Sequence, residues 1–283
     1  MSELRLDPLT REWVAIVGDR QTRPNLPASG CPFCVGGLEA PEPYTVRAFT
    51  NRWPPFEPGP PVDATDTDHA PELAMLPARG AAEVLLYTSE HDGSLASIGI
   101  EGARAVVDLW AERTRALLDR PEIEYVLVFE NRGATVGATI SHPHGQIYAF
   151  AFTPPVPRKE AEVAAARGCP LCTQVPEEVQ AADRIVTDDG EWVAYVPFAS
   201  GDPYGLIVAP RSHVAGLPDL GAGDRDALAA TLVDVVGRYD RMFDAPMPYL
   251  MWVHPGVHLH IHFAPPLRAP DVARYVASGE LGS

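Results

Sequence analysis

The sequence predicts an α+β fold built from two tandem copies of one unit, and three observations support this. Two Cys-x-x-Cys pairs, Cys31/Cys34 and Cys169/Cys172, occur in the first and second halves of the chain. Each pair is followed by the same order of elements, namely a strand, a histidine, an amphipathic helix, a strand and a His-x-His segment. The 283 residues are 46% hydrophobic, which allows a substantial core. We therefore expect two copies of one α+β unit.

In the first unit, residues 83–88 form a strand-like run that leads to His91. Apolar periodicity predicts a helix over 102–119. Its expected core residues are Val106, Val107, Trp110, Leu117 and Leu118. A strand is predicted over 123–129, and a loop containing glycine then leads to the segment His142-Pro-His144-Gly-Gln146.

In the second unit, strands are predicted over 192–198 and 204–209, and the latter leads to His213. A helix is predicted over 224–243. Its expected core residues are Leu228, Leu232, Val235, Val236, Tyr239 and Met242. A strand over 249–253 then leads to His258-Leu-His260-Ile-His262. The proline-rich stretch 153–157 separates the units, so the predicted domains are residues 1–155 and 156–283.

The cysteine pairs favour metal over disulfide, because no export signal precedes them. A Cys-x-x-Cys turn supplies two of the four ligands of tetrahedral zinc, and each half offers two histidines for the rest. The predicted sets are Cys31, Cys34, His91 and His142, and Cys169, Cys172, His213 and His258. Four protein ligands leave no open position, so we expect structural zinc. A redox dithiol is the competing interpretation.

Charge and hydropathy exclude some classes of function. A net charge of −16 argues against a general nucleic-acid binder. No apolar run is long enough to span a membrane, and no signal peptide opens the chain, so we expect a cytoplasmic protein.

The segment from Phe129 to Tyr148 contains Asn131-x-Gly-x-x-x-Gly137 followed by His142-Pro-His144-Gly-Gln146. It resembles the signature of the galactose-1-phosphate uridylyltransferases, the transferase branch of the histidine-triad superfamily. The resemblance extends to Leu9-Thr-x-x-Trp13, to Arg20-x-x-Arg23-Pro and to the terminal His-x-His-Phe-x-Pro-Pro. It implies two tandem histidine-triad-like units, each an antiparallel sheet with flanking helices, that form one continuous, pseudo-symmetric structure.

The residues agree with the chemistry of that family. Residues two apart in a strand face the same side, so His142, His144 and Gln146 project together. An unprotonated, oriented imidazole is a good nucleophile toward phosphorus. We expect His144 to attack the α-phosphorus of a nucleotide sugar and to form a nucleotidyl-histidine. A second phosphate then accepts the nucleotidyl group. The resemblance makes the donor UDP-glucose and the acceptor galactose 1-phosphate.

The resemblance also implies supporting roles. Gln146 hydrogen-bonds the transferred phosphoryl group, and His142, fixed by zinc, holds the backbone beside His144. Further implied substrate contacts are Arg20, Arg23, Asn51, Asn131, Gly137, Thr139, Arg274 and Glu280. The pair Arg20 and Arg23 can equally be exposed arginines in a loop. Gly279 replaces the family's usual aromatic residue before the glutamate, so the hexose stays open.

Two further expectations concern metal and assembly. In the family, a glutamate and three histidines of the second half hold a further metal, often iron. The matching residues are Glu160, His254, His260 and His262. Whether this half binds one metal or two, and whether the further metal is iron or zinc, is left open. Because relatives share the sugar pocket between subunits, the resemblance implies a homodimer.

Two alternatives remain at this point. One is a nucleotide-sugar phosphorylase or a transferase with another base or sugar, which would use His144 in the same way. The other is a zinc-stabilised nucleotide-binding module without turnover, which the intact His-Pro-His-Gly-Gln segment disfavours.

Overall fold

The structure is a computed structural model that describes residues 2–18, 30–60, 62–63, 69–274, 276–277 and 281–282. Its first-half elements are β1 Ser2–Leu6, β2 Trp13–Val17, β3 Arg47–Thr50, β4 Met75–Pro77, β5 Gly80–Leu86, α1 Gly99–Leu118, β6 Tyr125–Arg132, η2 Ala134–Val136 and β7 His144–Phe150. Then come α2 Pro155–Arg167, α3 Pro170–Ala181, β8 Ile185–Asp188, β9 Trp192–Tyr195, β10 Leu206–Pro210, η3 Leu217–Asp219, α4 Ala222–Met242, β11 Tyr249–His254 and β12 His260–Ala264. The short strands β13 Leu267–Ala269, β14 Val272–Ala273, β15 Val276–Ala277 and β16 Leu281–Gly282 follow. Within the described residues, no helix is long and apolar enough to cross a membrane.

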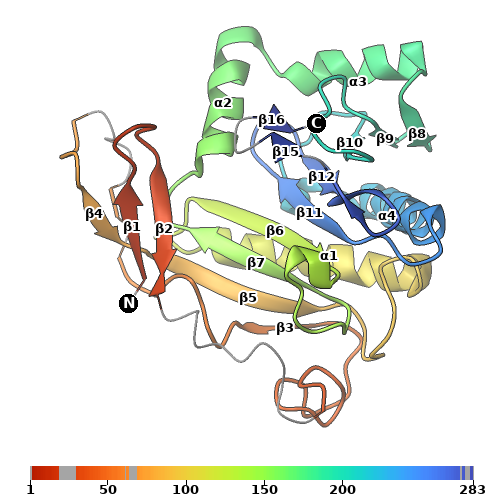
Figure 1. The fold of residues 1–283 in the computed structure, drawn as a ribbon, viewed down its shortest axis with the longest axis horizontal. Helices are drawn as coiled ribbons and strands as arrows, with labels where there is room; N and C mark the ends of the chain where they lie inside the picture. The colour runs from red at the N-terminus through yellow and green to blue at the C-terminus, as the bar shows by residue number, and fades with distance from the viewer. Residues whose placement is uncertain are drawn as a thin grey trace.

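One nine-stranded sheet runs through both halves, in the order β3-β5-β7-β6-β11-β12-β10-β9-β8 (Figure 1). Every neighbouring pair in it is antiparallel. Outward from the central pair β6 and β11, the order β7-β5-β3 on one side matches β12-β10-β9 on the other. The predicted α+β class with antiparallel sheets is confirmed, and the repeat has an approximate two-fold axis between β6 and β11.

Helices α1 and α4 pack against each other behind the sheet and enclose the main core (Figure 1). Both were predicted, and their expected core residues are buried except for two. Leu118 is 43% exposed and Met242 is 39% exposed, so these two assignments were wrong. Each is the last residue of its helix, where no following turn covers it. Leu118 also points about 100° away from the buried Leu117.

The face of the sheet opposite these helices carries the histidines. In β7, Ile147 and Ala149 enter the core, so the alternating residues His144 and Gln146 face the other way. In β12, Ile261 and Phe263 enter the core. His260 and His262 therefore face the same side as His144 and Gln146. The repeat thus places two His-x-[Gln/His] pairs on one face, on either side of the two-fold axis.

Helices α2 and α3 were not predicted from the sequence, because prolines in both segments argue against a helix. Pro155 and Pro157 lie in the first turn of α2, where a missing N–H costs nothing. Pro170 opens α3 in the same way, and Pro176 lies inside it. The chain therefore crosses between the halves as a helix that begins inside the predicted boundary 153–157. A separate small sheet, β2-β1-β4, lies beside the first half (Figure 1).

Candidate active site and metal centres

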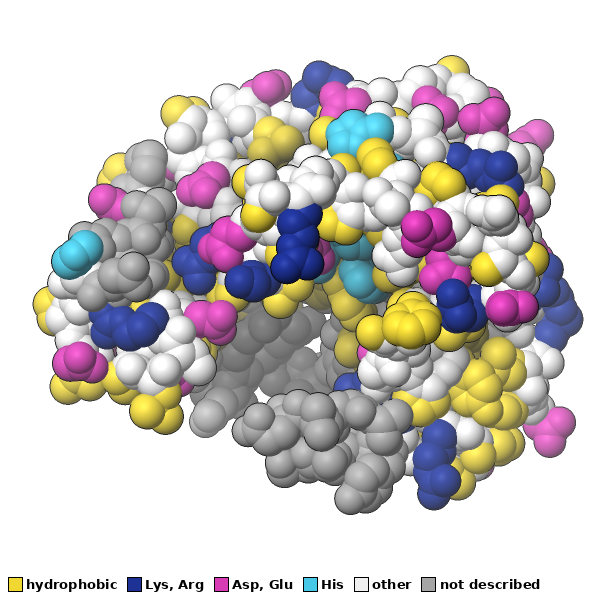
Figure 2. All heavy atoms as spheres, turned by 90° about the horizontal axis from the view of Figure 1, so that it is seen from above, with side chains coloured by type: hydrophobic (Ala, Val, Ile, Leu, Met, Phe, Trp, Pro, Cys, Tyr) yellow, Lys and Arg dark blue, Asp and Glu magenta, His cyan; other side chains and the backbone are white. Residues whose placement is uncertain are grey.

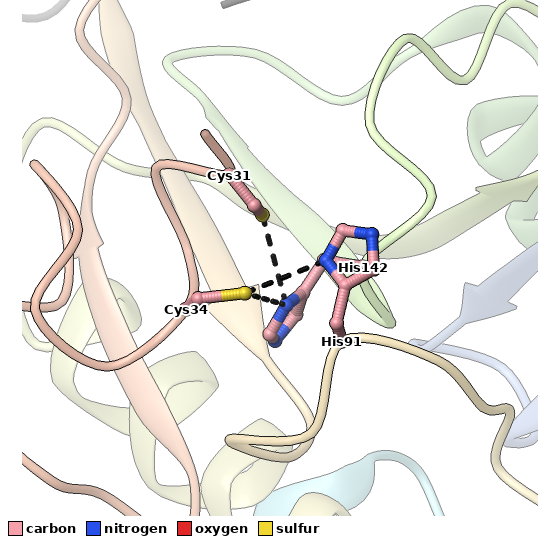
Figure 3. Close-up of side chains that lie close together, drawn as sticks. All are labelled: Cys31, Cys34, His91 and His142. Atoms are coloured by element: carbon pink, nitrogen blue, oxygen red, sulfur yellow. Dashed lines mark hydrogen bonds between the residues drawn. The ribbon is translucent and has the colours of Figure 1, made fainter. Parts of the chain in front are cut away.

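Four side chains from three segments of the first half converge on one point (Figure 3). Cys34 Sγ lies 3.4 Å from His91 Nδ1 and 3.7 Å from His142 Nδ1, and Cys31 Sγ lies 3.8 Å from His142 Nδ1. Zinc–sulfur and zinc–nitrogen bonds in a tetrahedral site put S and N about 3.6 Å apart. The four residues predicted for the first zinc site are therefore brought together in an arrangement that can hold a metal ion.

His142 is fully buried, and its second nitrogen is held by neighbours that the sequence pattern did not single out. Nε2 lies 2.8 Å from the carbonyl oxygen of Thr88 and 3.0 Å from Tyr44 Oη. A carbonyl only accepts, so Nε2 carries the proton and Nδ1 keeps its lone pair for the metal. Burial also lowers the pKa of His142, which favours the neutral ring that a metal needs.

The second half repeats this arrangement. Cys172 Sγ lies 3.2 Å from His213 Nδ1 and 3.6 Å from His258 Nδ1, while Cys169 Sγ lies 3.5 Å from His258 Nδ1. His258 Nε2 lies 3.1 Å from the carbonyl oxygen of Pro210, as His142 does from that of Thr88. Burial lowers the pKa of His258 as well. The second set of four predicted ligands is thus also brought together.

His144 begins β7, two residues after the buried metal-site histidine His142. Its Nδ1 lies 2.7 Å from the carbonyl oxygen of His142. Because that oxygen can only accept, Nδ1 carries a proton, so in the neutral ring Nε2 is the nitrogen with the lone pair that a nucleophile requires. The ring of Phe33 packs edge-on at 5.1 Å between centroids and fixes the imidazole plane. Two contacts of the His144 ring therefore come from the first ligand set. One is the backbone carbonyl of His142, and the other is Phe33, which lies within the Cys-x-x-Cys turn.

Gln146 lies beside Asn51, which is 4% exposed. Asn51 Nδ2 donates to Gln146 Oε1 at 3.4 Å, and Asn51 Oδ1 accepts from the backbone N–H of Trp53 at 2.9 Å. These contacts engage the oxygen of the Gln146 amide and point its NH₂ group away from Asn51. The NH₂ group is a hydrogen-bond donor, which is what a phosphoryl oxygen needs as its partner.

The loop after β6 forms the wall of two adjoining cavities beside His144. The smaller, of about 50 Å³, contacts Asn131 and His144, and the larger, of about 870 Å³, contacts Gly137 and Thr139. Gly133 has φ 96° and a Cβ there would lie 2.7 Å from Pro248. The loop therefore needs glycine where it crosses to the second half. Asn131, Gly137 and Thr139, the expected phosphate contacts, therefore line two adjoining cavities, and the smaller cavity also borders His144.

Gly145, between His144 and Gln146, faces the core side of β7. A Cβ at this position would lie 2.1 Å from Tyr87 Oη and 3.0 Å from the carbonyl oxygen of Phe129. Such distances do not occur in relaxed proteins, so the strand needs glycine to pass over Tyr87.

We expect Gly145→Ala to lower the free energy of unfolding by about 1–3 kcal/mol through overpacking, and to move the flanking side chains of His144 and Gln146. Gly223→Ala is the matched control, since nothing lies within 4 Å of its added methyl group on α4. That variant should be slightly more stable than the parent protein. Urea unfolding measures both, and equal stability of Gly145→Ala and the parent would contradict the contact.

Glu130 is buried beneath the site, on the core side of β6. Its Oε1 accepts from Tyr249 Oη at 3.1 Å, and its Oε2 has no hydrogen-bond partner among the described residues. Burial raises the pKa of Glu130 to about 7, more than the nearby Arg132 lowers it. No sequence pattern pointed to this residue.

We expect the pH dependence of stability to carry the signature of Glu130. Because its pKa is higher in the folded chain, the folded state binds the proton more tightly, and stability falls as pH rises from about 4.5 to about 7. The loss amounts to roughly 3 kcal/mol. Glu130→Gln should remove this slope and unfold at higher urea than the parent protein at pH 8. Tyr249→Phe keeps the carboxyl group and should keep the slope, whereas parallel curves for the parent and Glu130→Gln would refute the assignment.

A third cluster joins α2 to β11 and β12, with ligand atoms of Glu160, His254, His260 and His262 within 4.8 Å of one another. Glu160 Oε1 lies 3.0 Å from His254 Nδ1 and 3.7 Å from His260 Nε2. Burial raises the pKa of Glu160, but contacts with these histidines outweigh it and bring it to about 2. His262 Nε2 is buried and makes no hydrogen bond in the described part of the chain, as expected of a metal ligand. The residues therefore fit a metal ion.

Three of the predicted residues, Arg20, Arg23 and Glu280, lie outside the described residues. Arg274 forms an ion pair with Asp202. Conversely, the sequence analysis missed Tyr44 and Phe33 as supports. Phe33 lies inside the Cys-x-x-Cys turn and could have been suspected, whereas Tyr44 carries no spacing signal.

Comparison with known proteins gives the context of this site. Residues 1–154 match the model of the galactose-1-phosphate uridyl transferase N-terminal domain, and residues 159–279 match that of the C-terminal domain. The chain belongs to this family. Membership explains the duplicated sheet, since both halves of the family's architecture are present.

Individual members of the galactose-1-phosphate uridyl transferase family cover the chain from end to end. The galactose-1-phosphate uridylyltransferase of Thermotoga maritima is 36% identical over all of this chain and 93% of its own length. The enzyme of Rattus norvegicus is 30% identical over 98% of this chain and 82% of its own. A solved uridylyltransferase structure superposes with a TM-score of 0.84 at 29% identity, covering 99% of this chain and 92% of its own. An ADP-glucose phosphorylase of Arabidopsis thaliana shares the fold, with a TM-score of 0.69 at 22% identity over 95% of this chain and 90% of its own.

Proposed function

We propose that the protein transfers a uridylyl group from UDP-glucose to galactose 1-phosphate through a covalent uridylyl-His144. The observation that carries this proposal is the hydrogen bond from His144 Nδ1 to the carbonyl oxygen of His142, which in the neutral ring leaves the lone pair on Nε2 of a histidine that lines the smaller cavity. The names of the relatives support uridylyl transfer and galactose 1-phosphate as a substrate, and UDP-glucose is the donor that the resemblance implies.

In the first half-reaction, His144 Nε2 attacks the α-phosphorus, the bond from phosphorus to the β-phosphate oxygen breaks, and glucose 1-phosphate leaves. In the second, a phosphate oxygen of galactose 1-phosphate attacks the same phosphorus, and Nε2 regains its lone pair. The NH₂ group of Gln146 donates to a non-bridging oxygen, a contact that typically contributes a few kcal/mol in the transition state. Asn131 and Thr139 provide further donors along the loop.

Zinc in the two Cys₂His₂ sites supplies structural rigidity, because four protein ligands saturate it. Glu160, His254, His260 and His262 would hold a further metal, iron or zinc. The predicted homodimer, in which Arg274 and Glu280 contribute to a shared sugar pocket, belongs to the same proposal, as does a cytoplasmic location.

The test is product formation over a panel of UDP-, ADP- and GDP-sugars with galactose 1-phosphate, glucose 1-phosphate and inorganic phosphate as acceptors. We expect UDP-glucose with galactose 1-phosphate to give the highest kcat/KM. Parallel double-reciprocal lines, and label exchange between UDP-glucose and glucose 1-phosphate without acceptor, should accompany it. Turnover with an adenylyl or guanylyl donor and inorganic phosphate alone would identify a phosphorylase instead.

A further inference from the structure

A cavity of about 270 Å³ lies in the second half, against the third cluster. Its polar wall consists of Lys159, Glu160, His258, His260 and His262, and its apolar wall includes Val163, Leu171 and Ile207. Figure 2, which views the molecule from the side of α2 and α3, shows histidine side chains within a hollow of this face. Three of the four candidate metal ligands therefore border one apolar cavity.

The repeat explains why this cavity exists. His260 matches His144, and its Nδ1 lies 2.7 Å from the carbonyl oxygen of His258, as His144 Nδ1 does from that of His142. Leu171, in the second Cys-x-x-Cys turn, matches Phe33 in the first. The ring of Phe33 covers His144 at 5.1 Å, whereas the shorter Leu171 leaves space over His260 and His262.

The charge of the cluster differs from that of the two cysteine-containing sites. Two thiolates neutralise a divalent metal there, while Glu160 alone leaves a net charge of +1 in the third cluster. Of the two metals proposed for this cluster, iron accepts more than four ligands, so three imidazoles and one carboxylate would leave a position open on it, whereas they would saturate zinc. A buried, uncompensated charge is costly, so an anion at the open position would be stabilised.

We propose that the metal centre of Glu160, His254, His260 and His262 binds one small monocarboxylate, whose apolar body fills the adjoining cavity. The carboxylate neutralises the residual charge, and Val163, Leu171 and Ile207 contact the apolar part. This proposal rests on metal occupancy of the cluster and not on uridylyl transfer.

The test uses the full chain loaded with Co²⁺, whose visible spectrum responds to a change of ligands. Glu160→Ala, which disrupts only this cluster, gives the reference spectrum, and the two saturated Cys₂His₂ sites give a constant background. We expect benzoate and azide each to change the Glu160-dependent spectrum, with saturation at one equivalent per chain. Metal analysis of the same samples establishes whether the cluster is loaded.

Leu171→Phe distinguishes binding in the cavity from binding at the open metal position. It introduces the aromatic ring that Phe33 provides in the first half, and it keeps all metal ligands. We expect this variant to keep its metal content and its azide response, and to bind benzoate at least tenfold more weakly. A loaded cluster that responds to neither anion, or benzoate binding unchanged in Leu171→Phe, overturns the proposal. An unloaded cluster overturns it too, and UDP-glucose turnover in the same samples reports separately on the proposed function.

Discussion

Replacing His144 with glycine is expected to lower uridylyl transfer by at least about a thousandfold, because the proposed nucleophile is removed. The variant keeps Asn131 and Gln146 beside the phosphate loop, so it should still bind UDP-glucose in calorimetry. It also keeps the carbonyl of His142 and the first metal site. Since the missing group is an imidazole, added imidazole should accept the uridylyl group and give uridylyl-imidazole and glucose 1-phosphate.

The matched control is His69→Gly, which removes an exposed histidine that belongs to none of the metal clusters. It should turn over like the parent protein and should give no uridylyl-imidazole above background. If label exchange between UDP-glucose and glucose 1-phosphate requires galactose 1-phosphate, and no acid-labile adduct forms at His144, the transfer is direct. The covalent mechanism would then be rejected.

The sequence was most informative where a chemical requirement forces a spacing. Cysteine pairs and histidines at matching positions in both halves were enough to predict the α+β repeat and two of the three ligand sets that the structure brings together. The third set, with Glu160, came from the resemblance to the family. Alternation along a strand was enough to place His144 and Gln146 on one face. These inferences depend on local geometry, which the order of residues determines directly.

Contacts between distant segments could not be predicted in this way. The pairing of β6 with β11 joins the halves into one sheet, yet neither strand contains a signal that selects the other as its partner. Tyr44 reaches His142 only because the chain folds back after the first cysteine pair. Glu130 sits in a strand whose pattern gives no reason to expect a buried carboxyl group. Such features depend on packing between distant segments, and no local pattern in a single sequence indicates which segments pack together.

The first metal site should matter for catalysis as well as stability, and the repeat offers a matched pair of variants to separate the two. Changing both Cys31 and Cys34 to serine should remove one zinc per chain, measured by elemental analysis. Changing both Cys169 and Cys172 to serine should remove one as well. Because metal binding contributes directly to folding free energy, both variants should unfold at lower urea than the parent protein.

Only the first pair is expected to lower uridylyl transfer strongly, by about 10–100-fold measured per folded molecule. The reason lies in the backbone: His142 is a predicted metal ligand, and its carbonyl oxygen accepts a hydrogen bond from His144 Nδ1 at 2.7 Å. Loss of the metal therefore frees the acceptor that sets the His144 tautomer, and it also frees Phe33, which packs on the ring. The second site supports His260, which takes no part in the proposed transfer. Equal losses of activity in the two variants would mean that zinc acts only through global stability, and an unchanged zinc content in the Cys31/Cys34 variant would exclude the first site altogether.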